Sequence, residues 1–279
     1  LHWTASESAH VLQSHPEEVV RRILDSPRRR VLCSHTAFAP PKMMGRLFLL
    51  NGYLPVFDAT QPHDVSVGIT SPLGRPVLNA RHVDRDKSTV AAAWEVASGY
   101  PLAVDPLTHE GPILEKSEGD GTNDGRILSA PLAPEAITPS KVYQRLVDNV
   151  LGEEVVDYRV PVYRGRVSLV KEKFRPLGDR FSNHSVRTVL RAPSDVFSDD
   201  ERRHLGRAAR ELGLDYAEMD VLRDQATGRS YVVDASPVPG VGAWGLTPGD
   251  ERRHARRIAA DFDRSIESVL SGESFAGGG

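Results

Sequence analysis

The stretch "LGLDYAEMDVLRDQATGRSYVVDASPVPG", residues 212–240, carries the pattern that decides the fold. Two runs of strand-forming residues, YAEMDVL and SYVVDAS, are separated by a polar turn near Ala226 to Gly228. The second run ends at Pro237 and Pro239, which exclude a helix. These residues predict a β-hairpin whose second strand has a rigid exit.

Three side chains of this hairpin carry oxygen atoms that could bind a metal ion. Asp220 lies on the first strand, whereas Asp234 and Ser236 lie two residues apart on the second and therefore share one face. If the register sets Asp220 opposite Asp234, the oxygens converge in the way that Mg²⁺ prefers. The alternative from these residues alone is a solvent-exposed hairpin face with two ordinary aspartates.

The bulk composition is that of an ordinary globular protein. The chain has 279 residues, of which 39% are hydrophobic and 26% charged, enough for one large or two modest domains. A net charge of −3 gives no field that recruits nucleic acid or an anionic membrane, and we expect the arginine clusters at 28–30 and 252–257 to be solvated. No apolar run reaches the roughly 18 residues of a membrane span, and the start lacks signal-peptide features. We expect a soluble cytoplasmic protein with no nucleic-acid or membrane partner.

The single cysteine excludes an intrachain disulfide and indicates a reducing compartment. Cys33 lies in "VLCSHT", which predicts a buried strand in which Cys33 acts as a small hydrophobe. The alternative is a nucleophile formed by Cys33 and His35, although such pairs are seldom adjacent in sequence.

The first third of the chain predicts a small α/β unit. Its expected elements are a helix over 16–26, a strand over 28–35, and a helix followed by a strand over 45–59, with a break at Asn51–Gly52. From residue 84 onwards, hairpins and helices alternate. The expected elements are a helix ending at Gly99, a hairpin joining 112–114 to 127–128, a strand-to-helix segment over 140–151, a hairpin turning at Arg164–Gly165, a helix over 198–213 with a capping box from Ser198 to Glu201, and a last helix capped by Thr247.

The tip of the first of these hairpins has the composition of a phosphate-binding loop. Lys116 ends a strand immediately before a tip that contains Gly119, Gly121 and Gly125. Glycine backbone approaches phosphate oxygens closely, and an adjacent ammonium neutralises their charge. Asp120 and Asp124 oppose an anion unless they turn outward. A flexible hairpin loop is the alternative.

The order of these segments resembles the ATP-grasp superfamily of carboxylate–amine and carboxylate–thiol ligases, which also includes some kinases. The resemblance covers about residues 84–240 and follows DKS, the lysine-ended hairpin, VYQRLVDN, DYRVPVYRGRV, GLDYAEMDVLRD and YVVDASPVPG. It implies an α/β fold of two α+β lobes that clamp ATP, preceded by a small α/β domain. The implied boundaries are 1–83 for the N-terminal domain, 84–150 for the small lobe and 151–279 for the C-terminal lobe.

The resemblance implies roles for individual residues of this sequence. Phosphate contacts are implied for Lys87 and Lys116, and a mobile flap for Gly119, Gly121 and Gly125. Adenine contacts are implied for the segment Tyr143, Gln144, Arg145 and Leu146. Catalytic charges are implied for Lys116, Arg159, Lys171, Lys173 and Arg175, and metal binding for Asp220, Asp234 and Ser236.

This sequence departs from the pattern of the superfamily at three positions. Asp234 stands where Glu is usual, and Ser236 stands where Asn is usual. Glu218 occupies the place of an arginine that many of these ligases direct at the acyl intermediate, so the stabilising cation is expected to be Arg175, Arg180 or a residue of the first domain.

The resemblance implies a ligase that uses ATP with Mg²⁺, or Mn²⁺, to join a carboxylate to an amine through an acyl phosphate. The expected partners are small-molecule carboxylates and amines, namely amino acids or peptides, and a homodimer is left open. Substrate choice is assigned to the first third of the chain and to residues 175–185, where Asn183 resembles a position near the phosphates or metal. The alternatives are a kinase of the same superfamily and a nucleotide-binding protein with weakened catalysis.

Overall fold

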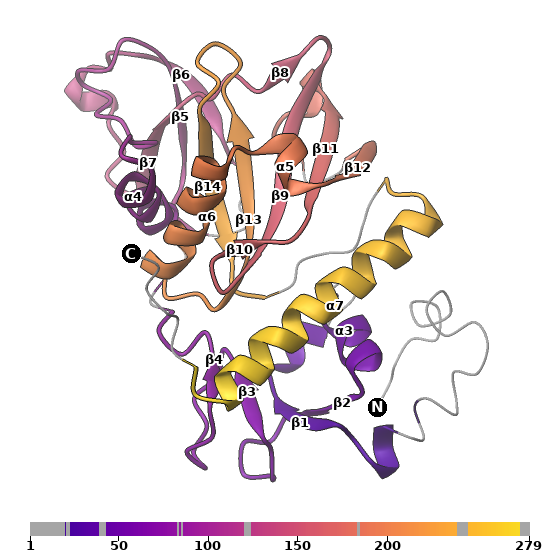
Figure 1. The fold of residues 1–279 in the computed structure, drawn as a ribbon. Coiled ribbons are helices and arrows are strands. Elements are labelled where there is room, and N and C mark those ends of the chain that lie inside the picture. The colour runs from indigo at the N-terminus through magenta and orange to yellow at the C-terminus, as the bar shows by residue number, and fades with distance from the viewer. Residues whose placement is uncertain are drawn as a thin grey trace.

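The computed structural model describes residues 20, 23–38, 43–82, 84, 86–119, 124–182, 185–238 and 245–273. Its strands form sheets of four, three and seven strands. Figure 1 shows the four-stranded sheet at one end of the molecule and the two other sheets at the opposite end, with helix α7 running between them.

The four-stranded sheet is parallel and has the order β2-β1-β3-β4. Its strands are β1 (Arg29–Leu32), β2 (Tyr53–Val56), β3 (Val65–Val67) and β4 (Val77–Leu78). Helix α3 (Met44–Asn51) ends at Gly52, whose φ of 70° suits a left-handed helix cap. The predicted break at Asn51–Gly52 is therefore confirmed. Of the helix expected over 16–26, only part lies among the described residues.

Cys33 is buried directly after β1, as expected for a small hydrophobe. Burial raises the pKa of its thiol to about 12, so the thiol stays protonated at neutral pH. The ring of His35 stacks on Phe57 with a centroid distance of 4.0 Å. These contacts argue against a Cys33–His35 nucleophile.

The last helix, α7 (Pro248–Leu270), packs on the N-terminal sheet although the two lie at opposite ends of the sequence (Figure 1). The Thr247 side chain caps α7 by accepting a hydrogen bond from the Asp250 N–H, as predicted. The apolar face of α7 shares a hydrophobic cluster with β1, α3 and β3. The helix residues in this cluster are Ala255, Ile258, Ala259, Phe262 and Ile266. A helix that the sequence-based division groups with residues 151–279 therefore stabilises the N-terminal unit.

The seven-stranded sheet has the order β12-β11-β9-β13-β14, and β8 and β10 also pair with β9. Its strands are β8 (Val150–Leu151), β9 (Glu154–Tyr163), β10 (Arg166–Val167), β11 (Val170–Pro176), β12 (Arg187–Arg191), β13 (Tyr216–Arg223) and β14 (Ser230–Ser236). The hairpin turn at Arg164–Gly165 and the β13–β14 hairpin are confirmed.

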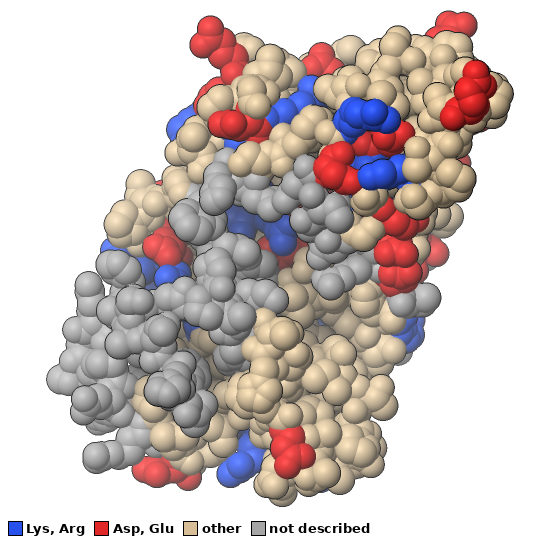
Figure 2. Space-filling model, turned by 180° about the vertical axis from the view of Figure 1, so that it is seen from behind, with Lys and Arg blue, Asp and Glu red and all other residues tan. Residues whose placement is uncertain are grey.

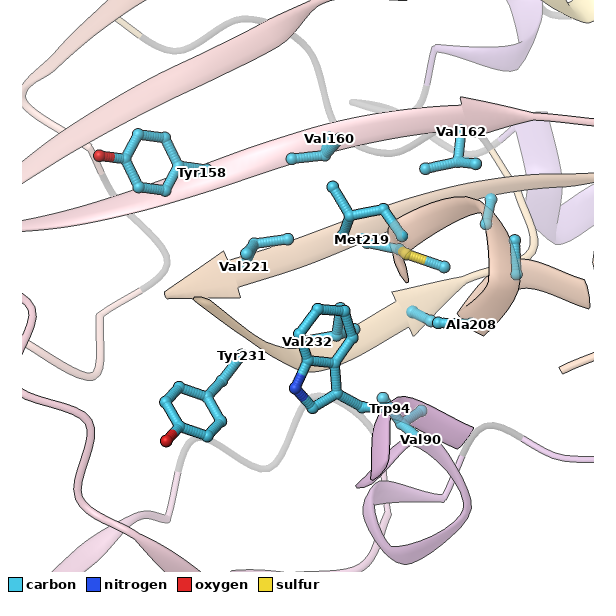
Figure 3. Close-up of a cluster of buried hydrophobic side chains, with 14 of the residues drawn as sticks. Val90, Trp94, Tyr158, Val160, Val162, Ala208, Met219, Val221, Tyr231 and Val232 are labelled. Carbon is cyan, nitrogen blue, oxygen red and sulfur yellow. The ribbon is translucent and has the colours of Figure 1, made fainter. Parts of the chain in front are cut away.

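Helices α4 (Lys87–Ser98) and α6 (Asp199–Glu211) cover one face of this sheet. Figure 3 shows the resulting core, in which Trp94 of α4 lies beside Val232 of β14, and Met219 of β13 belongs to the same cluster. The predicted capping box of α6 is present between Ser198 and Glu201. A short helix, α5 (Pro193–Val196), precedes α6.

The three-stranded sheet has the order β6-β5-β7. Its strands are β5 (Gly111–Ser117), β6 (Arg126–Ala130) and β7 (Lys141–Arg145). The strand-to-helix prediction for 140–151 is wrong in its second half, because residues 146–149 after β7 form neither helix nor strand and lead into β8. The side chain of Asn149 ties this segment to β9 by donating to the Val156 carbonyl at 3.0 Å and to Asp157 at 2.9 Å.

Short 3₁₀ helices complete the described chain at η1 (His35–Phe38), η2 (Pro134–Ala136) and η3 (Leu177–Asp179). On the face seen in Figure 2, lysine and arginine side chains are interspersed with aspartate and glutamate side chains. Among the helices of the described ranges, none combines the length and the apolar character needed to cross a membrane.

Candidate active site

The seven-stranded sheet is apolar on the face covered by α4 and α6 and charged on the other face. Tyr158, Val160 and Val162 of β9 belong to the core. Strand alternation therefore directs the residues between them to the opposite face. The charged residues on that face are Asp157 and Arg159 of β9, Lys171, Lys173 and Arg175 of β11, Glu218 and Asp220 of β13, and Asp234 of β14. The charges thus gather on one surface without disturbing the core.

Four of these residues form a continuous row across neighbouring strands. Lys171 is paired with Arg159, Arg159 with Asp220, and Asp220 with Asp234. The register between β13 and β14 shifts directly after Asp220. The condition that Asp220 lies opposite Asp234, on which the predicted metal site depends, is confirmed.

Arg159 lies between two carboxylates. Its Nε donates to Glu218 Oε2 at 2.9 Å, and one of its terminal nitrogens, Nη1, donates to Asp220 Oδ2 at 2.7 Å. Lys171 Nζ lies 3.9 Å from the same oxygen of Glu218. Burial alone would raise the pKa of Glu218, but the charges of Lys171 and Arg159 outweigh it and lower that pKa to about 2. Glu218 is therefore ionised at neutral pH.

Asp220 keeps one oxygen open. Its Oδ1 is buried and has no hydrogen-bond partner within the described part of the chain. Although burial opposes ionisation, Arg159 and Lys173 lower the pKa of Asp220, so the carboxylate carries its charge. A buried, charged and unpaired oxygen is a position that a cation would satisfy.

The donors around Asp220 fit Mg²⁺. Asp234 lies opposite it, and Ser236 lies two residues further along the same strand. The Ser236 hydroxyl donates to the Val238 carbonyl at 3.1 Å, which leaves the lone pairs of Oγ able to bind a cation or a bridging water. Within the described ranges, no three His, Cys, Asp or Glu side chains form a complete metal cage. Mg²⁺ usually takes its remaining ligands from water and substrate phosphates.

The three-stranded sheet supplies Lys116 at the end of β5. Burial and the neighbouring charge of Lys87 lower the pKa of Lys116 to about 8, and the charge of Asp234 acts in the opposite direction. Lys87 itself donates to the backbone carbonyls of Glu118 and Gly119. Both predicted phosphate-binding lysines therefore lie at the base of the glycine-rich hairpin.

The hairpin tip is only partly described. Gly121 and Asp120 lie outside the described residues. Asp124 is turned towards Lys141, whose Nζ lies 2.5 Å from it, so this carboxylate is neutralised locally. At Gly125, a Cβ atom would lie 3.2 Å from Leu114 and 3.3 Å from Phe181, so the hairpin closely approaches the 177–182 loop of the larger sheet.

The predicted adenine segment begins within β7. The Tyr143 carbonyl accepts from the Val104 N–H at 3.1 Å, and the Arg145 N–H donates to the Leu102 carbonyl at 2.9 Å. These groups join the 102–104 segment to β7, and Leu146 is the first predicted contact beyond the strand. The Gln144 side chain is buried, and its Nε2 has no hydrogen-bond partner among the described residues. Adenine binding by this segment stays a prediction.

The two arginines proposed from sequence as acyl-stabilising cations have structural partners. Arg175 pairs with Asp157 and donates to the Ser182 carbonyl at 2.6 Å. Arg180 donates to the Val147 carbonyl and to Asn149 Oδ1, at 2.8 Å for the latter. Lys173 lies opposite Asp157 in the register. Asn183 lies outside the described residues.

Comparison with solved structures identifies the architecture. The chain is similar to the ATP complex of D-alanine–D-alanine ligase from Bacillus anthracis, with 15% identity over 88% of this chain and 98% of that chain, at a TM-score of 0.56. It is also similar to the ATP-grasp ligase PsnB complexed with minimal precursor, Mg and ADP, with 17% identity over 86% of this chain and 96% of that chain, at a TM-score of 0.54.

This chain has the ATP-grasp fold. The predicted fold class is confirmed. The division into an N-terminal α/β unit and two lobes stays a prediction, in which the parallel four-stranded sheet would be the N-terminal unit and the three- and seven-stranded sheets the lobes. Another PsnB complex matches at a TM-score of 0.46, and this chain spans 62% of its length. No protein-family model matches the chain, and no curated protein matches it in sequence.

One further buried residue, which the sequence did not indicate, interacts electrostatically with the charged row. His254 of α7 is 0% exposed, and neither ring nitrogen has a hydrogen-bond partner within the described ranges. Burial and the positive charge of Lys171 lower its pKa to about 3, while Glu218 acts in the opposite direction. His254 carried no recognisable signal because no ligand spacing surrounds it, and only the packing of α7 brings it here.

Proposed function

We propose that this protein is an ATP- and Mg²⁺-dependent ligase that joins a carboxylate to an amine. The proposal is carried by the cross-strand row of Lys171, Arg159, Asp220 and Asp234, and by Lys116 of the three-stranded sheet, on which the charge of Asp234 acts. This row combines carboxylates for a hard cation with cations for phosphate oxygens. The shared fold with D-alanine–D-alanine ligase and PsnB supports the same reaction class.

Asp220 and Asp234 would hold the metal ion, with Ser236 beside them. The bound Mg²⁺, or Mn²⁺, supplies positive charge beside the nucleotide phosphates. Lys87 and Lys116 would bind the phosphates from the small lobe, under a flap that includes Gly119, Gly121 and Gly125. The segment Tyr143, Gln144, Arg145 and Leu146 would bind adenine.

The proposed reaction has two displacement steps. An oxygen of the substrate carboxylate attacks the γ-phosphorus of ATP, and the bond to the β–γ bridging oxygen breaks, which gives an acyl phosphate and ADP. The amine nitrogen then attacks the acyl carbon, phosphate leaves, and the nitrogen loses a proton. Arg159 and Lys171, and Lys173 beyond them, would neutralise the negative charge that develops during these steps. Arg175 would act by holding Asp157 and the 177–182 loop.

We assign amino acids or peptides as the substrate class. The neighbours in structure support this choice, because one is a D-alanine–D-alanine ligase and the other is complexed with a precursor. The mixed signs of the charged row would suit a substrate that carries both a carboxylate and an amine.

The test is an assay of phosphate and ADP release from ATP–Mg²⁺ with a panel of amino acids and peptides, supplied singly and in pairs. We expect phosphate release that requires both an acid and an amine, together with an amide product detected by mass spectrometry. Asp234→Ala should lower this turnover by at least about 100-fold, because it removes a proposed metal ligand. The fold should persist, because the side chain lies on the charged face rather than in the core.

Two outcomes would contradict the ligase proposal. ADP release without free phosphate would indicate a kinase, because the phosphoryl group would then remain on the acceptor. Binding of ATP–Mg²⁺ with no turnover for any acid–amine pair would indicate a nucleotide-binding protein. Normal turnover by Asp234→Ala would contradict the site assignment.

A further inference from the structure

We propose that Glu218 is a positioning residue that holds Arg159 so that one oxygen of Asp220 stays open to the metal ion. This inference rests on the proposed function, because it concerns the same metal site. Glu218 stands where many ligases of this fold have an arginine. In this structure the negative charge of Glu218 lies beside Arg159 and Lys171.

Glu218 is a buried residue of the candidate site. Its side chain is 0% exposed, and it lies opposite Ser236 in the register, two residues before Asp220 on β13. Its Oε2 accepts from Arg159 Nε at 2.9 Å and lies 3.9 Å from Lys171 Nζ. With these cations beside it, Glu218 serves as an anchor for positive charge rather than as a ligand of the metal.

The contacts of Arg159 are divided between two carboxylates. A guanidinium and a carboxylate prefer two parallel hydrogen bonds, which would engage both oxygens of one acid. Here Glu218 binds Nε and thereby fixes the orientation of the guanidinium, and Arg159 contacts Asp220 through Nη1 at Oδ2. The other oxygen, Oδ1, is the buried atom without a partner in the described chain.

Removal of the Glu218 carboxylate would free Nε of Arg159. The guanidinium could then turn, present two neighbouring nitrogens to both oxygens of Asp220, and compete with the cation. Removal of the Glu218 charge would also weaken metal binding directly. The cations Lys171 and Arg159 face the three carboxylates of Glu218, Asp220 and Asp234, so the loss of one carboxylate leaves less negative charge to attract the metal ion. A shorter acid separates the two effects, because Glu218→Asp keeps the charge but withdraws the carboxylate by one methylene.

The experiment uses Mn²⁺ as the probe, with bound ion measured by electron paramagnetic resonance of the full chain in the presence of ADP. We expect Glu218→Asp and Glu218→Gln to weaken Mn²⁺ binding by roughly 10-fold or more, the range seen when partners of metal ligands are removed. ADP affinity measured without metal should change less than Mn²⁺ affinity. The double variant Arg159→Gln with Glu218→Gln should recover Mn²⁺ affinity relative to Glu218→Gln alone, because the competing guanidinium is gone.

Asp261→Asn is the matched control, because Asp261 is a 0% exposed carboxylate that pairs with Arg264 on α7. It should bind Mn²⁺ as the wild type does. Circular dichroism and thermal unfolding establish that each variant is folded, and the double variant serves if Glu218→Gln alone does not fold. In that case it should bind Mn²⁺ more tightly than Glu218→Asp.

The outcomes separate this inference from the proposed function. Two results would overturn the positioning role while the metal site stands. One is that Glu218→Asp binds Mn²⁺ as the wild type does. The other is that the double variant binds Mn²⁺ no more tightly than Glu218→Gln alone. If wild-type protein with ADP does not bind Mn²⁺, both the proposed function and this inference are wrong.

Discussion

At the scale of single residues, Lys116 shows how the surroundings adjust a charge. Burial and the adjacent Lys87 lower its pKa to about 8, whereas Asp234 raises it. The proposed phosphate contact therefore depends on a group that loses its proton just above neutral pH.

We predict that nucleotide affinity falls as the pH rises above about 8, because the neutral amine of Lys116 no longer attracts phosphate. The affinity of a fluorescent ADP analogue, measured without metal between about pH 7 and pH 9, checks this expectation. Lys116→Arg is the control, since a guanidinium stays charged across this range. An identical pH dependence in both proteins would contradict the assignment.

His254 provides a second prediction, which concerns stability. Burial lowers its pKa to about 3 in the folded protein, whereas an unfolded chain has a histidine pKa of about 6.5. The unfolded state therefore binds the extra proton as the pH falls, so the contribution to stability is present above about pH 6.5 and is lost towards pH 3. Charges that act on the imidazole come from Lys171, Glu218 and Arg46.

We predict that His254→Leu makes unfolding less dependent on pH below about 6.5. At pH 7 the free energy of unfolding of the variant should lie no more than about 1 kcal/mol below that of the wild type, because the substitution removes two buried nitrogens that have no hydrogen-bond partner among the described residues. Urea unfolding at several pH values measures both effects. A loss of several kcal/mol at pH 7 would show that the imidazole makes a stabilising contact.

At the scale of elements, helix α6 packs closely against the β9–β10 turn. A Cβ atom at Gly206 would lie 2.2 Å from the Gly165 carbonyl oxygen, whereas one at Gly249 in α7 would meet its first neighbour at 3.9 Å. Both are helical glycines, but only the first lies against another backbone.

We predict that Gly206→Ala destabilises the protein by about 2 kcal/mol, because the new methyl group forces α6 away from the turn. Gly249→Ala should instead be neutral or stabilise the protein by up to about 1 kcal/mol, as helix propensity favours alanine. Chemical denaturation of the two variants gives the comparison. A stabilising Gly206→Ala would mean that α6 and the turn are not in contact.

At the scale of the whole molecule, α7 joins the N-terminal unit to the larger lobe. The ring of Phe262 lies 6.4 Å from that of Phe48 in α3 and 5.7 Å from that of Tyr216 in β13. Tyr216 lies on the strand that carries Glu218 and Asp220, so the support of the charged row includes a helix from the end of the chain.

We predict that Phe262→Ala lowers the free energy of unfolding by about 3–5 kcal/mol, the usual cost of removing a buried aromatic ring. Because the ring contacts both units, they should lose stability together, as monitored by tryptophan fluorescence and far-UV circular dichroism in denaturant. Val96→Ala is the control, since Val96 is 51% exposed and should change stability by less than about 0.5 kcal/mol. Unfolding of one unit alone would contradict a shared core.

Local signals were sufficient for many of the elements. Hairpin turns depend on residues adjacent in sequence, so Arg164–Gly165 and the turn before β14 were predictable, as was the capping box of Ser198. The segment after β7 was not, because its apolar spacing favours a helix, whereas in the structure the Asn149 side chain bonds the distant residues Val156, Asp157 and Arg180.

In the candidate site, too, some features were predictable from short stretches of sequence and others were not. The spacing of Asp234 and Ser236 predicted that the two side chains share one face, because strand alternation is a local property. The order of the motifs predicted the ATP-grasp fold through the resemblance to that superfamily. The role of Arg159 between Glu218 and Asp220, and the approach of His254 on α7, depend on strand register and on the return of the last helix. Such contacts join residues far apart in the chain, and their geometry is set by packing that no short stretch of sequence encodes.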